Sequence, residues 1–161
     1  MNTSPSPFRV IAPIHTGITV RSLSSSLQFW HSALGLPILR RLEFVPPLSA
    51  VVGHPAASLC SVILGLPDGS ELELCEYKAP ENRATVKPES HDVGSWHLGF
   101  LVEGMDDLME KMEGMSWKKV GPVGVLTQGP RKGARVVYMR DNDGTTLELF
   151  EKATEEGETV S

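Results

Sequence analysis

The amino-acid sequence predicts an α+β fold built from two copies of a β-α-β-β-β module. The first observation is a phrase that occurs twice, HxGxxV at residues 15–20 and again at residues 97–102. Each copy is followed by a second phrase, DGxxLEL, at residues 68–74 and 143–149. The third observation is the spacing of apolar residues. Segments in which they alternate, as in strands, and segments in which they recur every 3.6 residues, as in helices, follow one another in the same order in both halves.

The first module is expected over residues 12–78. Alternation predicts a strand at 13–20, with one face formed by Ile14, Ile18 and Val20 and the other by His15, Gly17 and Thr19. A helix is predicted at 23–34, because four large residues recur at helical spacing: Leu23, Leu27, Trp30 and Leu34. Ser22 suits the start of this helix and Gly35 its end. Strands at 37–44, 59–66 and 71–77 complete the module, and Pro67-Asp68-Gly69 joins the last two.

The second module is expected over residues 96–152, after a polar linker at 79–95 that contains proline. Its first strand has one apolar face, formed by Trp96, Leu98, Phe100 and Val102. A helix ending near Gly114 follows, marked by Met105, Leu108, Met112 and Met115. Strands are predicted at 117–120, 134–140 and 145–151. Residues 1–11 and the acidic residues 153–161 are expected to be tails.

The alternation places one histidine and one glutamate of each half on the face opposite the core. Glu73 lies between Leu72 and Leu74, and Glu148 lies between two leucines in the same way. Taken singly, such a glutamate or histidine is usually solvated or structural. Four of them at equivalent places in two copies favour a divided metal site of His15, Glu73, His97 and Glu148, because imidazole nitrogen and carboxylate oxygen together suit a divalent ion.

Composition excludes several other classes of function. The net charge is −5, no basic run exceeds Arg131-Lys132, and the aromatic residues are few, so a nucleic-acid partner is not expected. No apolar stretch approaches the ~20 residues that cross a bilayer, and residues 1–10 lack the features of a signal peptide, so a cytoplasmic location is expected. Cys60 and Cys75 flank the Asp68-Gly69 turn. If this turn closes a two-residue hairpin loop, Cys75 faces Val62 and Cys60 lies one diagonal away, so a disulfide is possible, but reduced thiols are favoured.

The chain resembles the vicinal oxygen chelate superfamily, the group of glyoxalase I, extradiol dioxygenases and methylmalonyl-CoA epimerases. The segments that carry the resemblance are HTGITVRSLSSSLQFWHSALGL, LELCEY, SWHLGF and RDNDGTTLELFE, within residues 12–152. It implies paired βαβββ modules that form a cupped eight-stranded mixed sheet, the glyoxalase-like fold, around one metal ion. It also implies that His15, Glu73, His97 and Glu148 are the ligands, brought together within one chain or across a homodimer.

The ligand set indicates the chemistry that the resemblance implies. Extradiol dioxygenases present two histidines and one glutamate, whereas four filled positions are similar to glyoxalase I. We therefore expect a metal-dependent lyase, isomerase or epimerase that moves a proton through a metal-bound enediolate of a small carbonyl or hydroxy-acid substrate. One divalent ion (Ni, Zn, Co, Mn, Mg or Fe) would bind, and Glu148 or Glu73 would be the general base. The alternatives are a metal-dependent dioxygenase or ring-opening enzyme and a ligand-sequestering protein without catalysis.

Three residues are candidates for contact with the substrate: Thr19, Arg131 and Lys132. Glyoxalase I has an arginine four residues after its first histidine, where this chain has Thr19, so glutathione is not indicated as part of the substrate. Arg21 is expected on the opposite face. Arg131 and Lys132, between glycines in the loop 127–133, could clamp an anionic group, and the long loop 45–57 could form a lid or a wall. Three further histidines have no counterpart in the other half: His31, His54 and His91.

Overall fold

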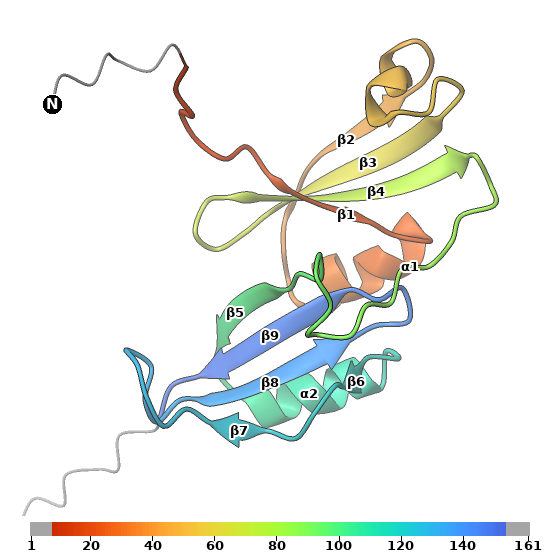
Figure 1. Ribbon diagram of the computed structural model, residues 1–161. Helices are drawn as coiled ribbons and strands as arrows, with labels where there is room; N and C mark the ends of the chain where they lie inside the picture. The colour runs from red at the N-terminus through yellow and green to blue at the C-terminus, as the bar shows by residue number, and fades with distance from the viewer. Residues whose placement is uncertain (1–7, 154–161) are drawn as a thin grey trace, which may run out of the picture. The chain divides into compact units, whose positions relative to one another are not determined.

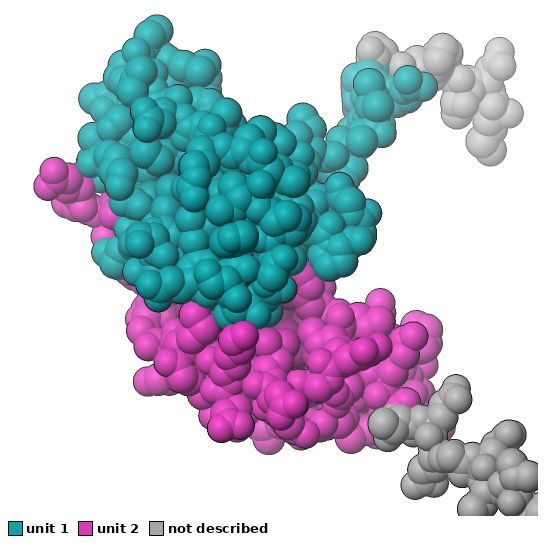
Figure 2. Space-filling view, turned by 180° about the vertical axis from the view of Figure 1, so that it is seen from behind, with its two compact units in different colours: residues 1–80 teal, residues 81–161 magenta. Residues whose placement is uncertain are grey.

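The computed structural model describes residues 8–153. The chain divides into two compact units, residues 1–80 and 81–161, coloured separately in Figure 2. Residues 1–7 of the predicted N-terminal tail and residues 154–161 of the predicted C-terminal tail lie outside the described residues. Both units combine a mixed sheet with few helices, so the predicted α+β class is confirmed.

The first unit holds four strands in the order β1-β4-β3-β2 (Figure 1). Strand β1 is parallel to β4, and the other two pairings are antiparallel. The elements are β1 (Thr16–Thr19), α1 (Leu23–Leu27), the π-helix η1 (Gln28–Ala33), β2 (Ile38–Phe44), the 3₁₀ helix η2 (Leu48–Val52), β3 (Ser58–Gly65) and β4 (Glu71–Ala79). This is the β-α-β-β-β order that the periodicity predicts.

The second unit holds a five-stranded sheet of the same topology, in which β5, β9, β8 and β6 are neighbours in that order and β7 also pairs with β8. Its elements are β5 (Leu98–Val102), α2 (Met105–Glu113), β6 (Lys118–Lys119), β7 (Gly124–Val125), β8 (Arg135–Arg140) and β9 (Thr146–Glu151). Strand β5 is parallel to β9, as β1 is to β4.

The sequence does not predict β7, and it predicts one longer strand at 117–120 in place of β6. Both short strands pair with β8, β6 at one end and β7 at the other. Between them lie Gly121 and Pro122, and proline has no backbone N–H to donate to a ladder. The described residues therefore contain nine strands in two sheets, where eight strands were expected.

The first helix begins as predicted and ends differently. Ser22 has extended backbone angles, and its side chain accepts a hydrogen bond from the backbone N–H of Ser25, which is the geometry of an N-cap. From Gln28 onward the helix widens to a π-helix, so the predicted helix 23–34 is two short segments. Phe29 and Trp30 are both buried there, with their ring centroids 5.2 Å apart.

Two residues predicted for apolar strand faces are exposed instead. Ile14 and Trp96 precede the strands that they were expected to join, because β1 begins at Thr16 and β5 at Leu98. Ile18 in β1 and Val20 directly after it are buried as predicted. Within the described residues, no helix is long and apolar enough to cross a membrane.

The hairpin between β3 and β4 has a loop of three residues, not two. Of Pro67, Asp68 and Gly69, only Gly69 has a positive φ, of +85°, and the backbone N–H of Leu66 bonds to the carbonyl of Ser70. A two-residue type I′ turn needs positive φ at both positions, so this sequence takes a three-residue loop. The register consequently moves by one residue, and Cys75 pairs with Ser61 instead of the predicted Val62. Cys60 and Cys75 are both free thiols.

Candidate functional site

In the first unit, His15 and Glu73 form a close pair. His15 lies immediately before β1, and Glu73 lies in β4, which runs parallel to β1. The register places Gly17, two residues after the histidine, beside Glu73. His15 Nε2 and Glu73 Oε2 are 2.9 Å apart, with the carboxylate side chain 13% exposed and the imidazole 38% exposed. We call this pair the first half-site.

In the second unit, His97 and Glu148 repeat the same arrangement. His97 lies immediately before β5, Glu148 lies in the parallel neighbour β9, and Gly99 is beside Glu148 in the register. His97 Nε2 and Glu148 Oε2 are 3.1 Å apart, again with the carboxylate less exposed than the imidazole. This pair is the second half-site, and it matches the first in register and nearly in distance.

The strands set the direction of both glutamates. Neighbouring side chains of a strand point to opposite faces, so the leucines that flank each glutamate fix its face. Those leucines are at most 1% exposed: Leu72, Leu74, Leu147 and Leu149. Each glutamate therefore lies on the sheet face away from the core that the leucines form, as the alternation predicts. We call this the open face of each sheet.

Tyr138 belongs to the second half-site, although the sequence reasoning missed it. It lies in β8, directly opposite Glu148. Its hydroxyl oxygen is 3.3 Å from His97 Nε2, and the two rings are 4.9 Å apart. Burial, and then the nearby Glu148 carboxylate, raise the pKa of Tyr138 above its ordinary value. The signal was present, since Val137 and Met139 are buried on the core face and alternation turns Tyr138 to the other face.

The first half-site has no tyrosine at the equivalent place. The residue opposite Glu73 is Ile63, which is 1% exposed. Two residues along β4, the Cys75 sulfur lies 3.5 Å from the hydroxyl of Ser61, and burial raises the pKa of this thiol. The two half-sites thus share the His-Glu pair and differ in the groups around it, which are apolar or thiol in the first and phenolic in the second.

The predicted substrate residues lie in different settings. Thr19 is an exposed residue of β1 beside Cys75. Arg131 lies with its guanidinium carbon 5.3 Å from the centre of the Phe150 ring. Lys132 is exposed, and within the described residues its side chain has no hydrogen bond or ion pair.

The histidines without a counterpart belong to neither pair. His31 is exposed in η1, and its Nδ1 is 2.8 Å from the backbone oxygen of Leu36. His54 and His91 are exposed as well. Among residues 8–153, no group of three or more His, Cys, Asp or Glu side chains is placed to hold a metal ion. The union of the two half-sites into one four-ligand site stays a prediction.

Comparison with known proteins identifies the family. Residues 12–149 match the sequence profile of the glyoxalase/bleomycin resistance protein/dioxygenase superfamily, so the chain belongs to this superfamily. The resemblance inferred from the sequence is thereby confirmed.

The similarity to known relatives and solved structures covers most of the chain. A lactoylglutathione lyase of Neisseria meningitidis is 28% identical over 141 residues, which cover 86% of this chain and 89% of that protein. A glyoxalase family protein from Bacillus cereus has a similar structure, with a TM-score of 0.78, 21% identity and coverage of 94% of this chain and 100% of that one. A mutant of the fosfomycin resistance protein FosX from Listeria monocytogenes, solved with Mn(II) and a dihydroxypropylphosphonic acid, has a TM-score of 0.59 and 13% identity, covering 92% of this chain and 94% of that one.

Proposed function

We propose that the protein is a metal-dependent enzyme of the lyase, isomerase or epimerase type, which transfers a proton at a carbon next to a carbonyl or hydroxyl group. Its metal ligands are His15 and Glu73 from the first half-site and His97 and Glu148 from the second. The observation that carries the proposal is the repetition of one His-Glu pair, with the same register and nearly the same distance, in both units. A duplicated solvent-exposed pair with no joint role would have no reason to keep both members in both copies.

The donor atoms of each half-site would fit a divalent metal ion. The imidazole nitrogen and the carboxylate oxygen are 2.9 Å apart in the first half-site and 3.1 Å apart in the second, close enough together to bind one ion. The donor set of two imidazoles and two carboxylates suits divalent ions of intermediate hardness, such as Mn, Fe, Co, Ni or Zn.

The reaction requires a metal ion, a general base and a hydrogen-bond donor to the substrate. A divalent ion at the four ligands would hold two neighbouring substrate oxygens and acidify the C–H bond beside them. Glu73 or Glu148 accepts the proton, since a carboxylate within hydrogen-bond reach of the reacting carbon can act as general base. Tyr138 has its hydroxyl 3.3 Å from Nε2 of His97, a proposed ligand, and would donate a hydrogen bond to a substrate oxygen.

The names of the relatives support this class of reaction and leave the substrate of this chain open. The Neisseria relative is a lactoylglutathione lyase, and the FosX structure contains a manganese ion and a small diol with an acidic group. Thr19 offers no cation where glyoxalase I has an arginine, which favours a substrate other than a glutathione adduct. The two half-sites come together within one chain or across a homodimer, so sedimentation of the metal-loaded protein is part of the test.

Metal analysis tests the proposal directly. The purified full-length chain is offered Mn, Fe, Co, Ni and Zn in turn, and bound metal is measured after removal of the excess. We expect one ion for each complete set of four ligands, and a loss of most of the bound metal in His97→Ala. His91→Ala is the control, because His91 is exposed and belongs to neither half-site. Equal metal binding by the two variants, or metal far below one equivalent in the unaltered protein, would overturn the proposal.

A further inference from the structure

The open face of the second sheet carries a cation beside the second half-site. Phe150 and Glu148 lie two residues apart on β9, so their side chains share this face. Gly99 confirms the arrangement, because a Cβ built there would lie 3.7 Å from both Glu148 Oε2 and the Phe150 ring. Glu148, Phe150 and the backbone of Gly99 therefore border one small area.

Arg131 is held over this area by the aromatic ring. Its guanidinium carbon is 5.3 Å from the Phe150 centroid, within the range of a cation–π contact. A planar guanidinium that rests on a ring keeps its N–H groups at the edge, where they can bind the two oxygens of a carboxylate or phosphate. Within the described part of the chain, the Arg131 side chain has no ion pair or hydrogen bond that already uses those donors.

Two other arginines of the second unit, both on β8, are already engaged. Arg135 binds the carboxylates of Asp106 and Glu151. Arg140 donates hydrogen bonds to Thr146 and Ser90. Unlike these two arginines, Arg131 has an aromatic support and, within the described residues, donors still available. In a chain of net charge −5, such a cation beside a glutamate offsets the local negative charge that would repel an anion.

We propose that Arg131, supported by Phe150, is the subsite for an oxyanion group of the substrate, and that the substrate is therefore a small hydroxy- or oxo-acid with a second anionic group, a carboxylate or a phosphate. This proposal rests on the proposed function, because the reacting carbon is taken to lie at Glu148. The anionic group binds at Arg131, on the Phe150 side of Gly99. Lys132, the neighbouring cation, rests on no aromatic ring among residues 8–153 and is assigned no role in this subsite.

Paired probes test the subsite in the manganese-loaded full-length protein. Malate and 2-hydroxybutyrate have the same carbon chain, but malate carries a carboxylate in place of the terminal methyl group, and 3-phosphoglycerate carries a phosphate. We expect calorimetric titration to show tighter binding of malate or 3-phosphoglycerate than of 2-hydroxybutyrate, by roughly tenfold. Arg131→Gln should remove this preference and leave the affinity for 2-hydroxybutyrate unchanged, whereas Lys132→Gln should keep it. Phe150→Leu should weaken the preference partly, because the arginine loses its support.

Two outcomes overturn the inference. The first is an equal affinity for the three probes, and the second is a preference that Arg131→Gln and Lys132→Gln reduce equally. A second measurement separates this failure from a failure of the metal site, namely the shift of the Arg131 guanidinium NMR signals on addition of malate to the protein without added metal. If the Arg131 signals shift but the protein binds no metal in the metal analysis, the proposed function is contradicted and the anion subsite is retained. If the protein binds metal but the Arg131 signals do not shift and the dianionic probes bind no more tightly than 2-hydroxybutyrate, the anion subsite is contradicted and the proposed metal site is retained.

Discussion

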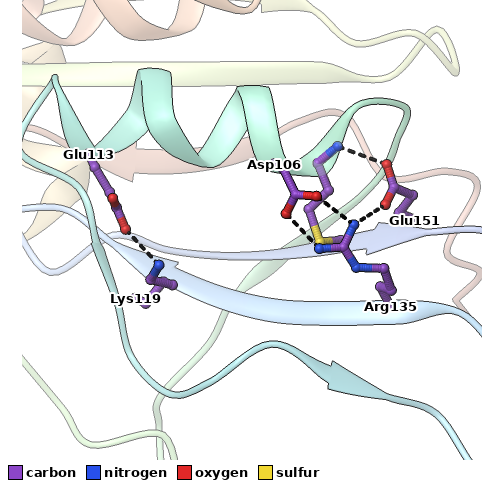
Figure 3. A network of polar contacts seen from close by, with 6 residues as sticks. Asp106, Glu113, Lys119, Arg135 and Glu151 are labelled. Atoms are coloured by element: carbon purple, nitrogen blue, oxygen red, sulfur yellow. Dashed lines mark hydrogen bonds and ion pairs between the residues drawn. The ribbon is translucent and has the colours of Figure 1, made fainter.

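The carboxylate of Glu151 accepts a hydrogen bond of 2.8 Å from the backbone N–H of Met105, the first residue of α2 (Figure 3). The first unit repeats this relationship, because Glu76 accepts a hydrogen bond of the same length from the backbone N–H of Leu23, the first residue of α1. Each glutamate lies three residues after the glutamate of its half-site, on the opposite face of the strand. The repeated LELxE segment therefore has one carboxylate for the half-site and one for the helix.

Loss of this contact should destabilise the second unit. Gly104 precedes α2 and has no side chain to satisfy the free N–H groups at the helix start, so Glu151 supplies the acceptor. We expect Glu151→Ala to lower the free energy of unfolding by about 1–2 kcal/mol. Urea denaturation followed by circular dichroism measures the change. Glu110→Ala, an exposed position of the same helix, is the control, and an equal effect of the two substitutions would contradict the role of Glu151.

The placement of the half-site glutamates could be predicted from the sequence, whereas their neighbours could not. Alternation within LEL suffices to turn Glu73 and Glu148 away from the core, because it depends only on adjacent residues. The contact between Tyr138 and His97 depends instead on the register of β8 against β9 and on the path of the chain before β5. Periodicity carries no information on such pairings between distant segments.

Helix caps and turns show the same limit. The bonds from Glu76 and Glu151 join residues 53 and 46 positions apart, so no local pattern announces them. The hairpin loop has three residues, and a two-residue loop at Asp68-Gly69 was the condition for pairing Cys75 with Val62; Pro67 before Asp68-Gly69 favours a type I turn followed by a left-handed glycine. The change from α1 to the π-helix η1 has no signal in the spacing of Leu23, Leu27 and Trp30, which a continuous helix would share.

Tyr138→Phe should leave metal binding intact. In the described structure the tyrosine hydroxyl lies 3.3 Å from His97 Nε2, the atom that the proposed function assigns to the metal. A hydroxyl that donates to this nitrogen competes for its lone pair, so its removal should keep or raise the metal affinity, with a change of less than about threefold. Calorimetric titration with Mn(II) measures this change. A loss of tenfold or more would instead make Tyr138 part of the metal site.

Asp106 should contribute to stability in a pH-dependent way. The Arg135 guanidinium, bound to both oxygens of Asp106, holds the pKa of that carboxyl below its ordinary value of 3.8 (Figure 3). A lowered folded-state pKa gives a stabilising contribution that is complete above the unfolded value and disappears as the pH falls through the folded value. The stability difference between the unaltered protein and Asp106→Asn should therefore be constant near neutral pH and shrink below about pH 4.

The neighbouring Asp107 gives the matched control for this pH dependence. It lies in the same first turn of α2 and is exposed, so Asp107→Asn alters the charge at the helix start in the same way. We expect unfolding curves at several pH values to show the acid-dependent change for Asp106→Asn and a smaller one for Asp107→Asn. The same pH profile for both variants would mean that the helix end, and not Arg135, is responsible.

Gly144 should tolerate alanine far less well than Gly69, although each ends the tight turn before the last strand of its unit. Both have positive φ, +92° at Gly144 and +85° at Gly69, so alanine is strained at either position. A Cβ at Gly69 meets nothing within 4 Å, whereas one at Gly144 would lie 2.3 Å from the backbone oxygen of Val86. We expect Gly69→Ala to cost about 1 kcal/mol of unfolding free energy, and Gly144→Ala at least about 2 kcal/mol, because the segment that holds Val86 must move. Equal costs in urea denaturation would show that this segment does not pack against the turn in solution.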